Sequence, residues 1–222
     1  MYLPNRSFEI AHFPTYAGMI AIITAIGWSS VSSAGKAFST SHAKNEEQRN
    51  MLEDKDGNVY PSKRMLDGKY WLTKNLNIKV PNSYCYDNKE ASCIRYGRLY
   101  TWEAAKKACG LLAHEWRLPT NNEWREMSKQ YGSAYDDSGN TGKLAYKALL
   151  EGGESQFNAL LSGNRDSDGK YSRLDAHGFY WTATECDASE AWFFNFARGS
   201  QSLYDQRGGD KSRAWSVRCI KP

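Results

Sequence analysis

Residues 116–124 read WRLPTNNEW, and this stretch decides how the middle of the chain folds. Thr120 and Glu123 stand at the spacing of a capping box, in which the residue before a helix and the glutamate at its third position bond each other's backbone N–H. Gly132 lies downstream, and glycine commonly ends helices. The pattern therefore predicts a helix over residues 121–131.

Upstream of this helix, Asp67-Gly68 separates two runs of β-forming residues, 58–65 and 69–76. An Asp-Gly pair between such runs predicts a β-hairpin, because both residues tolerate the backbone angles of a tight turn. Pro61 lacks the N–H that a sheet ladder uses. We therefore expect its strand to lie at a sheet edge or to carry an irregularity.

Two further segments have helical patterns. Residues 101–109 place apolar side chains on one face, with Thr101 suited to the N-cap and Gly110 to the position after the end. Residues 143–150 predict a shorter helix. The later chain is rich in Phe, Tyr, Trp and Val between turn clusters, which predicts an antiparallel sheet and an α+β domain. The predicted strands are residues 156–162, 178–184, 191–197 and 213–220.

The N-terminal region has the features of an export signal. Arg6 precedes an uncharged apolar run at residues 17–28, which is short for a membrane span of about 20 apolar residues. Ser32 and Ala34 suit the small-residue positions of a signal-peptidase site, and an uncleaved anchor is the alternative. The predicted organisation is a signal peptide over residues 1–34, a flexible linker over 35–53 and one domain over 54–222.

Composition limits the partners and the compartment. The chain has 29 Lys and Arg against 25 Asp and Glu, and the basic residues are scattered among the acidic ones. We therefore expect no nucleic-acid partner and no stable membrane span after signal cleavage. Export places the protein in the periplasm, on the cell surface or outside the cell. Thiols pair in such oxidising surroundings, and five cysteines leave at least one over.

Seven ordered strings carry a family resemblance: residues 54–60, 70–76, 85–88 with Cys93, 96–102, 116–120 with 123–124, 180–185 and 216–219. Together they resemble the Fibrobacter succinogenes major paralogous domain, found in exported bacterial proteins. That family looks like a branch of the C-type lectin-like fold, and it is distantly similar to the formylglycine-generating enzyme and sulfatase-modifying-factor group. The resemblance implies two to three helices packed on a twisted antiparallel sheet, with long irregular loops and neighbouring first and last strands.

The resemblance also implies how the cysteines pair. In C-type lectin-like domains a disulfide joins the first helix to the last strand, and Cys109 and Cys219 occupy those places. Cys85 and Cys93 lie close together in a loop and suit a second, local disulfide, which leaves Cys186 over. A thiolate metal site is the alternative, but these spacings are not those of zinc sites. We expect no metal and no cofactor.

Catalytic patterns are weak. Formylglycine-generating enzymes bind copper with two nearby thiols late in the chain. Here the late thiols are Cys186 and Cys219, and the second is assigned to a disulfide, so that role does not carry over. Glu123 and Glu185 are conceivable glycosidase carboxylates, but the capping box already accounts for Glu123. We expect no enzymatic activity.

A partial calcium motif lies in the later half of the chain. Asn164, Asp166 and Asp168 alternate, Gly169 follows, and Asp175 stands at the twelfth position of a calcium loop. Asp is shorter than the usual Glu there, and strands rather than helices are predicted on both sides. We therefore interpret the segment as a hairpin turn. The calcium-binding triplets of sugar-binding C-type lectins do not occur either.

The leading hypothesis is an exported, non-catalytic surface or secreted binding module for glycan or protein ligands. We expect the contact surface on residues 198–210, a glycine-rich segment between two strands, because rigid scaffolds hold binding residues on such loops. An ordinary solvated hairpin tip is the alternative. A structural envelope or adhesion component without a small ligand is the second hypothesis, and an oxidase of the formylglycine-generating kind the third. The candidate ligand-binding residues are Trp192, Arg198, Gln201, Tyr204 and Arg207.

Overall fold

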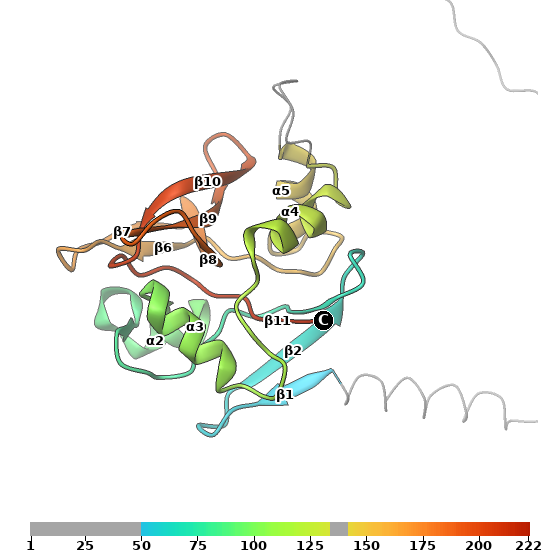
Figure 1. Ribbon diagram of the computed structural model, residues 1–222. Helices are drawn as coiled ribbons and strands as arrows, with labels where there is room; N and C mark the ends of the chain where they lie inside the picture. Colours follow the sequence, from blue (N-terminus) through green and yellow to red (C-terminus); the bar gives the residue numbers. More distant parts are fainter. Residues whose placement is uncertain (1–49, 134–141) are drawn as a thin grey trace, which may run out of the picture.

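The computed structural model describes residues 50–133 and 142–222 (Figure 1). The predicted signal peptide and nearly all of the linker lie outside the described residues. In chain order the elements are β1 (Met51–Glu53), β2 (Val59–Arg64), β3 (Tyr70–Leu72), β4 (Ser83–Tyr84), η1 (Tyr86–Asn88), α2 (Glu90–Tyr96), β5 (Leu99–Tyr100), α3 (Trp102–Gly110), α4 (Asn121–Lys129), α5 (Lys143–Leu149), β6 (Ser162–Arg165), β7 (Tyr171–Leu174), β8 (His177–Glu185), β9 (Glu190–Ala197), β10 (Ser202–Asp210) and β11 (Ile220–Lys221). The chain is therefore α+β. Within the described part, no helix is long and apolar enough to cross a membrane.

The first sheet joins the two ends of the domain, in the strand order β1-β2-β3-β11. The predicted hairpin is confirmed as β2 and β3, which pair antiparallel around the Asp67-Gly68 turn. Pro61 is not at an edge, because β2 lies between β1 and β3. The Pro61 carbonyl accepts the Thr73 N–H at 2.9 Å, at the point where the pairing of β2 with β3 ends. The N–H that proline lacks therefore removes no hydrogen bond from within that pairing. The domain begins before Asp54, since β1 already pairs with β2.

The second sheet has the order β10-β9-β8-β6-β7 and is not wholly antiparallel, because β6 and β8 pair in parallel at Gly163 and Gly178. The strands predicted over residues 178–184 and 191–197 are confirmed as β8 and β9. The prediction over 156–162 is wrong, since that segment is mostly irregular and β6 begins at its last residue. The strand predicted over residues 213–220 is not continuous. These residues make isolated β-bridges to other strands, and a regular strand, β11, begins only at Ile220.

The helices follow their predicted starts. The capping box of α4 is complete, with the Glu123 N–H donating to Thr120 Oγ1 and the Thr120 N–H donating to Glu123 Oε2. The predicted helices at residues 101–109 and 143–150 correspond to α3 and α5. Gly110 lies in the last turn of α3 rather than after it. Sequence analysis missed α2, which brings the helices of the described residues to four.

Two hydrophobic cores lie on opposite faces of β8 and β9. Alternate residues of a strand point to opposite faces, so Trp181 and Phe193 enter the first core while Tyr180 and Phe194 enter the second. The first core contains α3, Trp215 and the buried ends of β3 and the C-terminal segment. The second lies under α4 and α5. The paired strands β8 and β9 therefore separate the two cores, and each face of the sheet belongs to a different part of the molecular surface.

Candidate functional site

Residues 198–210 form a strand and not a loop, contrary to the sequence prediction. Residues 202–210 are β10, an edge strand paired antiparallel with β9, and only the first four residues form a turn. The alternation of a strand separates the predicted ligand-binding residues. Leu203 and Asp205 face the second core together with Phe196 and Phe194, whereas Tyr204 points to the other face.

Trp192 and Arg207 do come together, on the α4 side of the sheet. The Arg207 guanidinium lies 5.9 Å from the Trp192 ring centroid, and the Arg125 guanidinium of α4 lies 5.3 Å from it. Arg125 also pairs with Asp205, whose side chain is 3% exposed. Burial raises the pKa of Asp205, while the Arg125 contact opposes that rise. This arrangement fixes α4 onto β9 and β10 through an ion pair whose carboxylate is buried.

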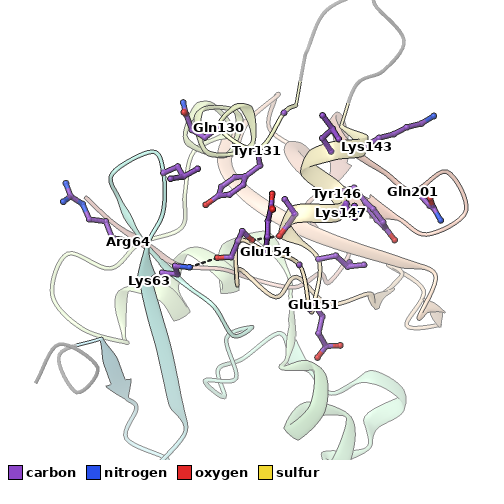
Figure 2. A pocket seen from close by; sticks show the side chains of 18 residues that line it. Lys63, Arg64, Gln130, Tyr131, Lys143, Tyr146, Lys147, Glu151, Glu154 and Gln201 are labelled. Carbon is purple, nitrogen blue, oxygen red and sulfur yellow. Dashed lines mark hydrogen bonds between the residues drawn. The ribbon is translucent and has the colours of Figure 1, made fainter. Parts of the chain in front are cut away.

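Gln201 lies at the edge of a groove with a cavity volume of about 1330 Å³ (Figure 2). The turn of the β2–β3 hairpin, the end of α4, α5 and the segment 151–155 form its walls. Figure 2 shows the Tyr131 ring and the Glu154 carboxylate pointing into this space, while Arg64 and Lys143 point outward from its rim. We call it the α4–α5 groove.

Cationic and apolar side chains share the rim of the α4–α5 groove. Leu66 and Leu144 are 66% and 61% exposed, among the most exposed large apolar residues described. Lys143 and Lys147 lie on α5 one turn apart, on the same side of the helix. Glu151 pairs outward with Arg95 at 2.7 Å. The groove thus offers exposed apolar groups beside positive charge.

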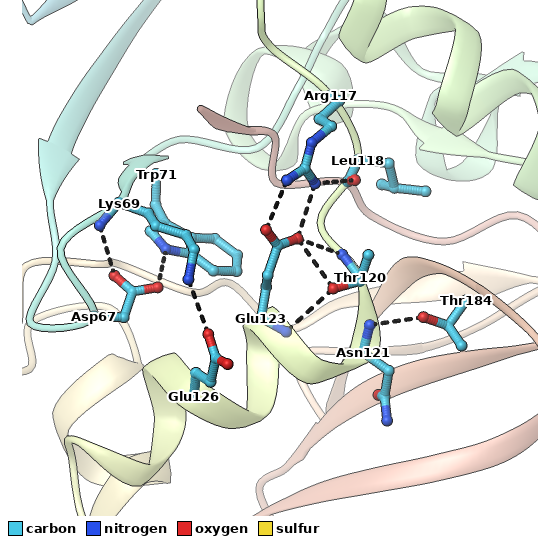
Figure 3. A network of polar contacts seen from close by, with 10 residues as sticks. All are labelled: Asp67, Lys69, Trp71, Arg117, Leu118, Thr120, Asn121, Glu123, Glu126 and Thr184. Carbon is cyan, nitrogen blue, oxygen red and sulfur yellow. Dashed lines mark hydrogen bonds and ion pairs between the residues drawn. The ribbon is translucent and has the colours of Figure 1, made fainter. Parts of the chain in front are cut away.

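The start of α4 is held by a polar network (Figure 3). The two terminal guanidinium nitrogens of Arg117, Nη1 and Nη2, donate to the Glu123 carboxylate at 2.8 and 2.7 Å. Burial alone would raise the pKa of Glu123, but the hydrogen bonds from Arg117 and Thr120 outweigh it and lower the pKa to about 2. One turn later, Glu126 pairs with Lys69 of the β2–β3 turn at 2.9 Å. The network positions α4, and with it one wall of the groove.

The carboxylates considered for catalysis are engaged separately. Glu123 belongs to the capping box, whereas Glu185 pairs with Lys211 at 2.9 Å. The partial calcium motif is a hairpin turn: Asp166 N–H donates to Lys170 O at 2.8 Å, and Asp168 pairs with the Lys170 side chain. Its carboxylates therefore bond neighbouring donors instead of converging on one point.

The structure contains both expected disulfides, Cys85–Cys93 and Cys109–Cys219, and Cys186 is the free cysteine of the described residues. Cys219 is thus unavailable as the second late thiol of a copper site. Cys85, Cys93 and Glu90 are the one group of suitable side chains close enough to hold a metal ion within the described ranges. Because both sulfurs are bonded to each other, they are not thiolate ligands. Two disulfides fit an extracellular or secreted protein.

Sequence reasoning missed the rim of the α4–α5 groove. The pattern Lys143-Leu144 with Lys147 was available in the predicted helix, and it places a leucine beside the lysine side of a short helix. Only the fold, which joins the β2–β3 turn to α4 through Lys69 and Glu126, places Leu66 on the same groove. Arg198 remains an exposed turn residue, with its N–H donating to Ala176 O.

Comparison with known families gives one match. The sequence model of the family described as the Fibrobacter succinogenes major domain matches residues 49–221, a range that includes all described strands and all four described α-helices. No curated protein matches the chain.

Proposed function

We propose that this chain, which belongs to the Fibrobacter succinogenes major domain family, is an exported, non-catalytic binding module that takes a protein ligand in the α4–α5 groove. Export rests on the apolar run and small residues of the predicted signal peptide. The two disulfides agree with it, since they persist in oxidising compartments. Of the side chains that could suggest catalysis, Glu123, Glu185 and Cys219 are each held in a separate structural contact, which leaves Cys186 without a second late thiol.

The observation that carries the proposal is the pair of exposed leucines on the groove. Leu66 and Leu144 expose 66% and 61% of their surface, although they belong to segments far apart in the sequence. Contiguous exposed apolar surface rimmed by polar residues marks interaction sites. A polypeptide covers such side chains with its own apolar groups, whereas a sugar chain uses hydroxyl groups and aromatic stacking. The leucines therefore favour a protein ligand.

The charges on the rim favour an acidic partner surface. Lys143 and Lys147 extend from the same side of α5, and Arg64 extends from the opposite wall. Such charges raise the rate of association with an oppositely charged surface, and this contribution weakens as salt screens it. We expect binding to be faster at low ionic strength than at high ionic strength.

We also assign the domain to the C-type lectin-like fold. The disulfide from α3 to the segment before β11 and the pairing of β11 with β3 support this assignment. A rigid scaffold that holds surface residues in fixed positions suits a binding module. The parallel pairing of β6 with β8 is an addition to the antiparallel sheet that the resemblance implied.

The test compares exposed apolar residues at matched sites. Leu144→Ser and Leu66→Ser remove the groove leucines, and Ile94→Ser on α2 is the control, because Ile94 is 70% exposed and lies outside the groove. The labelled purified domain is added to intact cells of the producing bacterium, before and after protease treatment of the cell surface. We expect protease-sensitive binding that falls at least about tenfold in both groove variants, or about 1.4 kcal/mol.

The control distinguishes binding by the groove from nonspecific binding by exposed apolar residues. Ile94→Ser should bind as the wild type does, and all three variants should melt within a few degrees of it, because exposed substitutions change stability by about 0.5 kcal/mol or less. Equal binding by wild type and Leu144→Ser would contradict the groove as the contact surface. A wild type that binds no cells would instead favour a structural envelope component.

A further inference from the structure

A second surface lies on the face of the β8–β9–β10 sheet opposite α4 and α5. Asn195 is at its centre, and its register partners are Phe179 of β8 and Tyr204 of β10. The diagonal neighbours on the same face are His177 and Gln206. We call this set of polar side chains, with Arg173 of β7 beside them, the Asn195 face.

A chain of hydrogen bonds crosses the Asn195 face. The Asn195 amide nitrogen donates to Gln206 Oε1 at 3.0 Å, and Asn195 Oδ1 lies 3.0 Å from His177 Nδ1. Because Asn195 Oδ1 can only accept, His177 Nδ1 carries the proton in this bond. Three side chains from three strands therefore hold one another in a single arrangement.

Two side chains of β10 on the Asn195 face can bond a ligand. Among the described residues, the Gln206 amide nitrogen and the Tyr204 hydroxyl have no side-chain hydrogen-bond partner, and Tyr204 is 38% exposed. Gln206 offers two N–H donors, and the Tyr204 hydroxyl both donates and accepts. The Tyr204 ring adds an apolar surface next to these polar groups.

Aromatic contacts hold the side chains of the Asn195 face in place. The His177 ring stacks on Phe179 with centroids 5.3 Å apart and an angle of 4° between the planes. The Arg173 guanidinium lies 5.8 Å from the same Phe179 ring. Phe179 in turn packs on Trp215 of the first core at 5.4 Å. Side chains fixed before binding lose less conformational entropy when a ligand arrives.

From this geometry we propose that the Asn195 face is a binding platform for a neutral glycan chain. Sugar hydroxyls donate and accept at once, as do the amide of Gln206 and the hydroxyl of Tyr204. Asn195 is only 8% exposed, so its part is to hold Gln206 in position from within the sheet. The apolar side of a sugar ring suits the Tyr204 ring. Adjacent strands lie about 4.8 Å apart, so β8 to β10 spans roughly 10 Å, which accommodates a disaccharide.

Charge and position distinguish this platform from the α4–α5 groove. Arg173 is the one lysine or arginine among the five named side chains, whereas the rim of the α4–α5 groove carries Arg64, Lys143 and Lys147. Leu203 and Phe196, on the opposite face of the same strands, pack into the second core beneath α5. The platform therefore goes beyond the proposed protein ligand, and either site can fail without the other.

The experiment measures binding of cellohexaose, mannohexaose and maltohexaose by calorimetry to the purified domain with its disulfides intact. Gln206→Ala and Tyr204→Ala remove the two ligand-bonding groups of β10. Gln201→Ala is the matched control, because Gln201 is an exposed glutamine of the same hairpin but lines the groove. We expect at least one hexasaccharide to bind, with Kd raised about tenfold or more in the first two variants and unchanged in the control.

Tyr204→Phe separates the ring from the hydroxyl, and we expect it to retain more affinity than Tyr204→Ala. Leu144→Ser should bind the sugar as the wild type does, which keeps the result independent of the groove. The proposal is overturned if no hexasaccharide binds at millimolar concentration, or if Gln206→Ala and Tyr204→Ala both bind as the wild type does. Stronger binding of an acidic oligogalacturonate than of every neutral sugar would also overturn it.

Discussion

The two cores on either side of β8 and β9 are built by different means. The first contains the Cys109–Cys219 disulfide, with both cysteines fully buried, and it joins segments from both ends of the domain. The second has no disulfide and is organised around Trp124, whose ring lies 5.1 to 5.7 Å from four other aromatic rings. A covalent bond secures one core, whereas ring packing and the polar start of α4 secure the other.

This difference matters for function because both sides of β8 and β9 carry candidate surfaces. The α4–α5 groove belongs to the second core, and the Asn195 face rests on Phe179 of the first. The groove is therefore expected to respond to changes in packing around α4, whereas the Asn195 face is expected to respond to loss of the disulfide.

The largest expected effect is loss of the first core's covalent bond. Replacing Cys109 and Cys219 together by Ala should lower the free energy of unfolding by about 4.7 kcal/mol, because the bond closes a long loop in the unfolded chain. Urea unfolding measures this loss. For a variant lacking Cys85 and Cys93, the same relation gives a loss of about 2.5 kcal/mol. If the Cys109 and Cys219 variant lost less unfolding free energy than that variant, the Cys109–Cys219 disulfide would not be the main covalent support of the first core.

Next in size is the centre of the second core. Trp124→Ala should cost about 4 kcal/mol, since a buried tryptophan is replaced by a cavity that its neighbours fill only in part. Trp124→Phe should cost less, because the ring contacts largely persist and the indole N–H has no partner among the described residues. Thermal and urea unfolding compare the two. Equal losses would show that ring packing does not organise this core.

The polar network at the start of α4 should make a pH-dependent contribution to the free energy of unfolding. Glu123 has a pKa of about 2 in the folded protein, below the ordinary value of a glutamate. A lowered pKa stabilises the folded state above the ordinary value, and that contribution disappears as the pH falls through the folded value. Glu123→Gln should therefore cost about 2 to 3 kcal/mol at pH 7 and much less near pH 2.

Urea unfolding at several pH values measures this dependence. The control is Glu126→Gln, one turn along α4, whose ion pair with Lys69 is exposed at the carboxylate and should contribute about 0.5 kcal/mol or less. A Glu123→Gln loss that stayed constant from pH 7 to pH 2 would contradict the ionised capping box.

The smallest expected effect is at the free cysteine. Cys186 lies in the turn between β8 and β9, outside both cores, so Cys186→Ser should change stability by about 0.5 kcal/mol or less. Peptide mapping without reduction should find Cys186 unbonded in monomers. A disulfide between Cys186 and any of the other four cysteines would change the pairing on which the comparison of the cores rests.

Local signals in the sequence were sufficient for several parts of the fold. The Asp67-Gly68 turn and the Thr120–Glu123 capping box depend on neighbouring residues, and both appear as predicted. The cysteine pairs followed from the family resemblance. Residues 198–210 were misinterpreted because their glycines and polar residues resemble a loop. Pairing with β9 and burial of Leu203 nevertheless make most of them a strand, with an irregularity between Gln206 and Gly209.

The candidate surfaces could not be predicted from the sequence, because they are formed by residues that only the fold brings together. Trp192 and Arg207 were singled out together and do meet. Tyr204 was singled out with them, but the alternation of β10 places it with Asn195 and Gln206 on the other face. The groove needs the β2–β3 turn and α5 to line the same space, although these segments lie far apart in the sequence and share no pattern.

The Cys109–Cys219 disulfide also closes a covalent ring that contains most residues of the two proposed surfaces. The sequence separation of 110 residues includes α4, α5 and β6 to β10. A protease that cuts one peptide bond inside this ring leaves the two pieces joined, so the nicked protein keeps its mass apart from one added water molecule. Outside the cell, where proteases are common and reductants scarce, a single cut would then leave the groove and the Asn195 face attached to the rest of the domain.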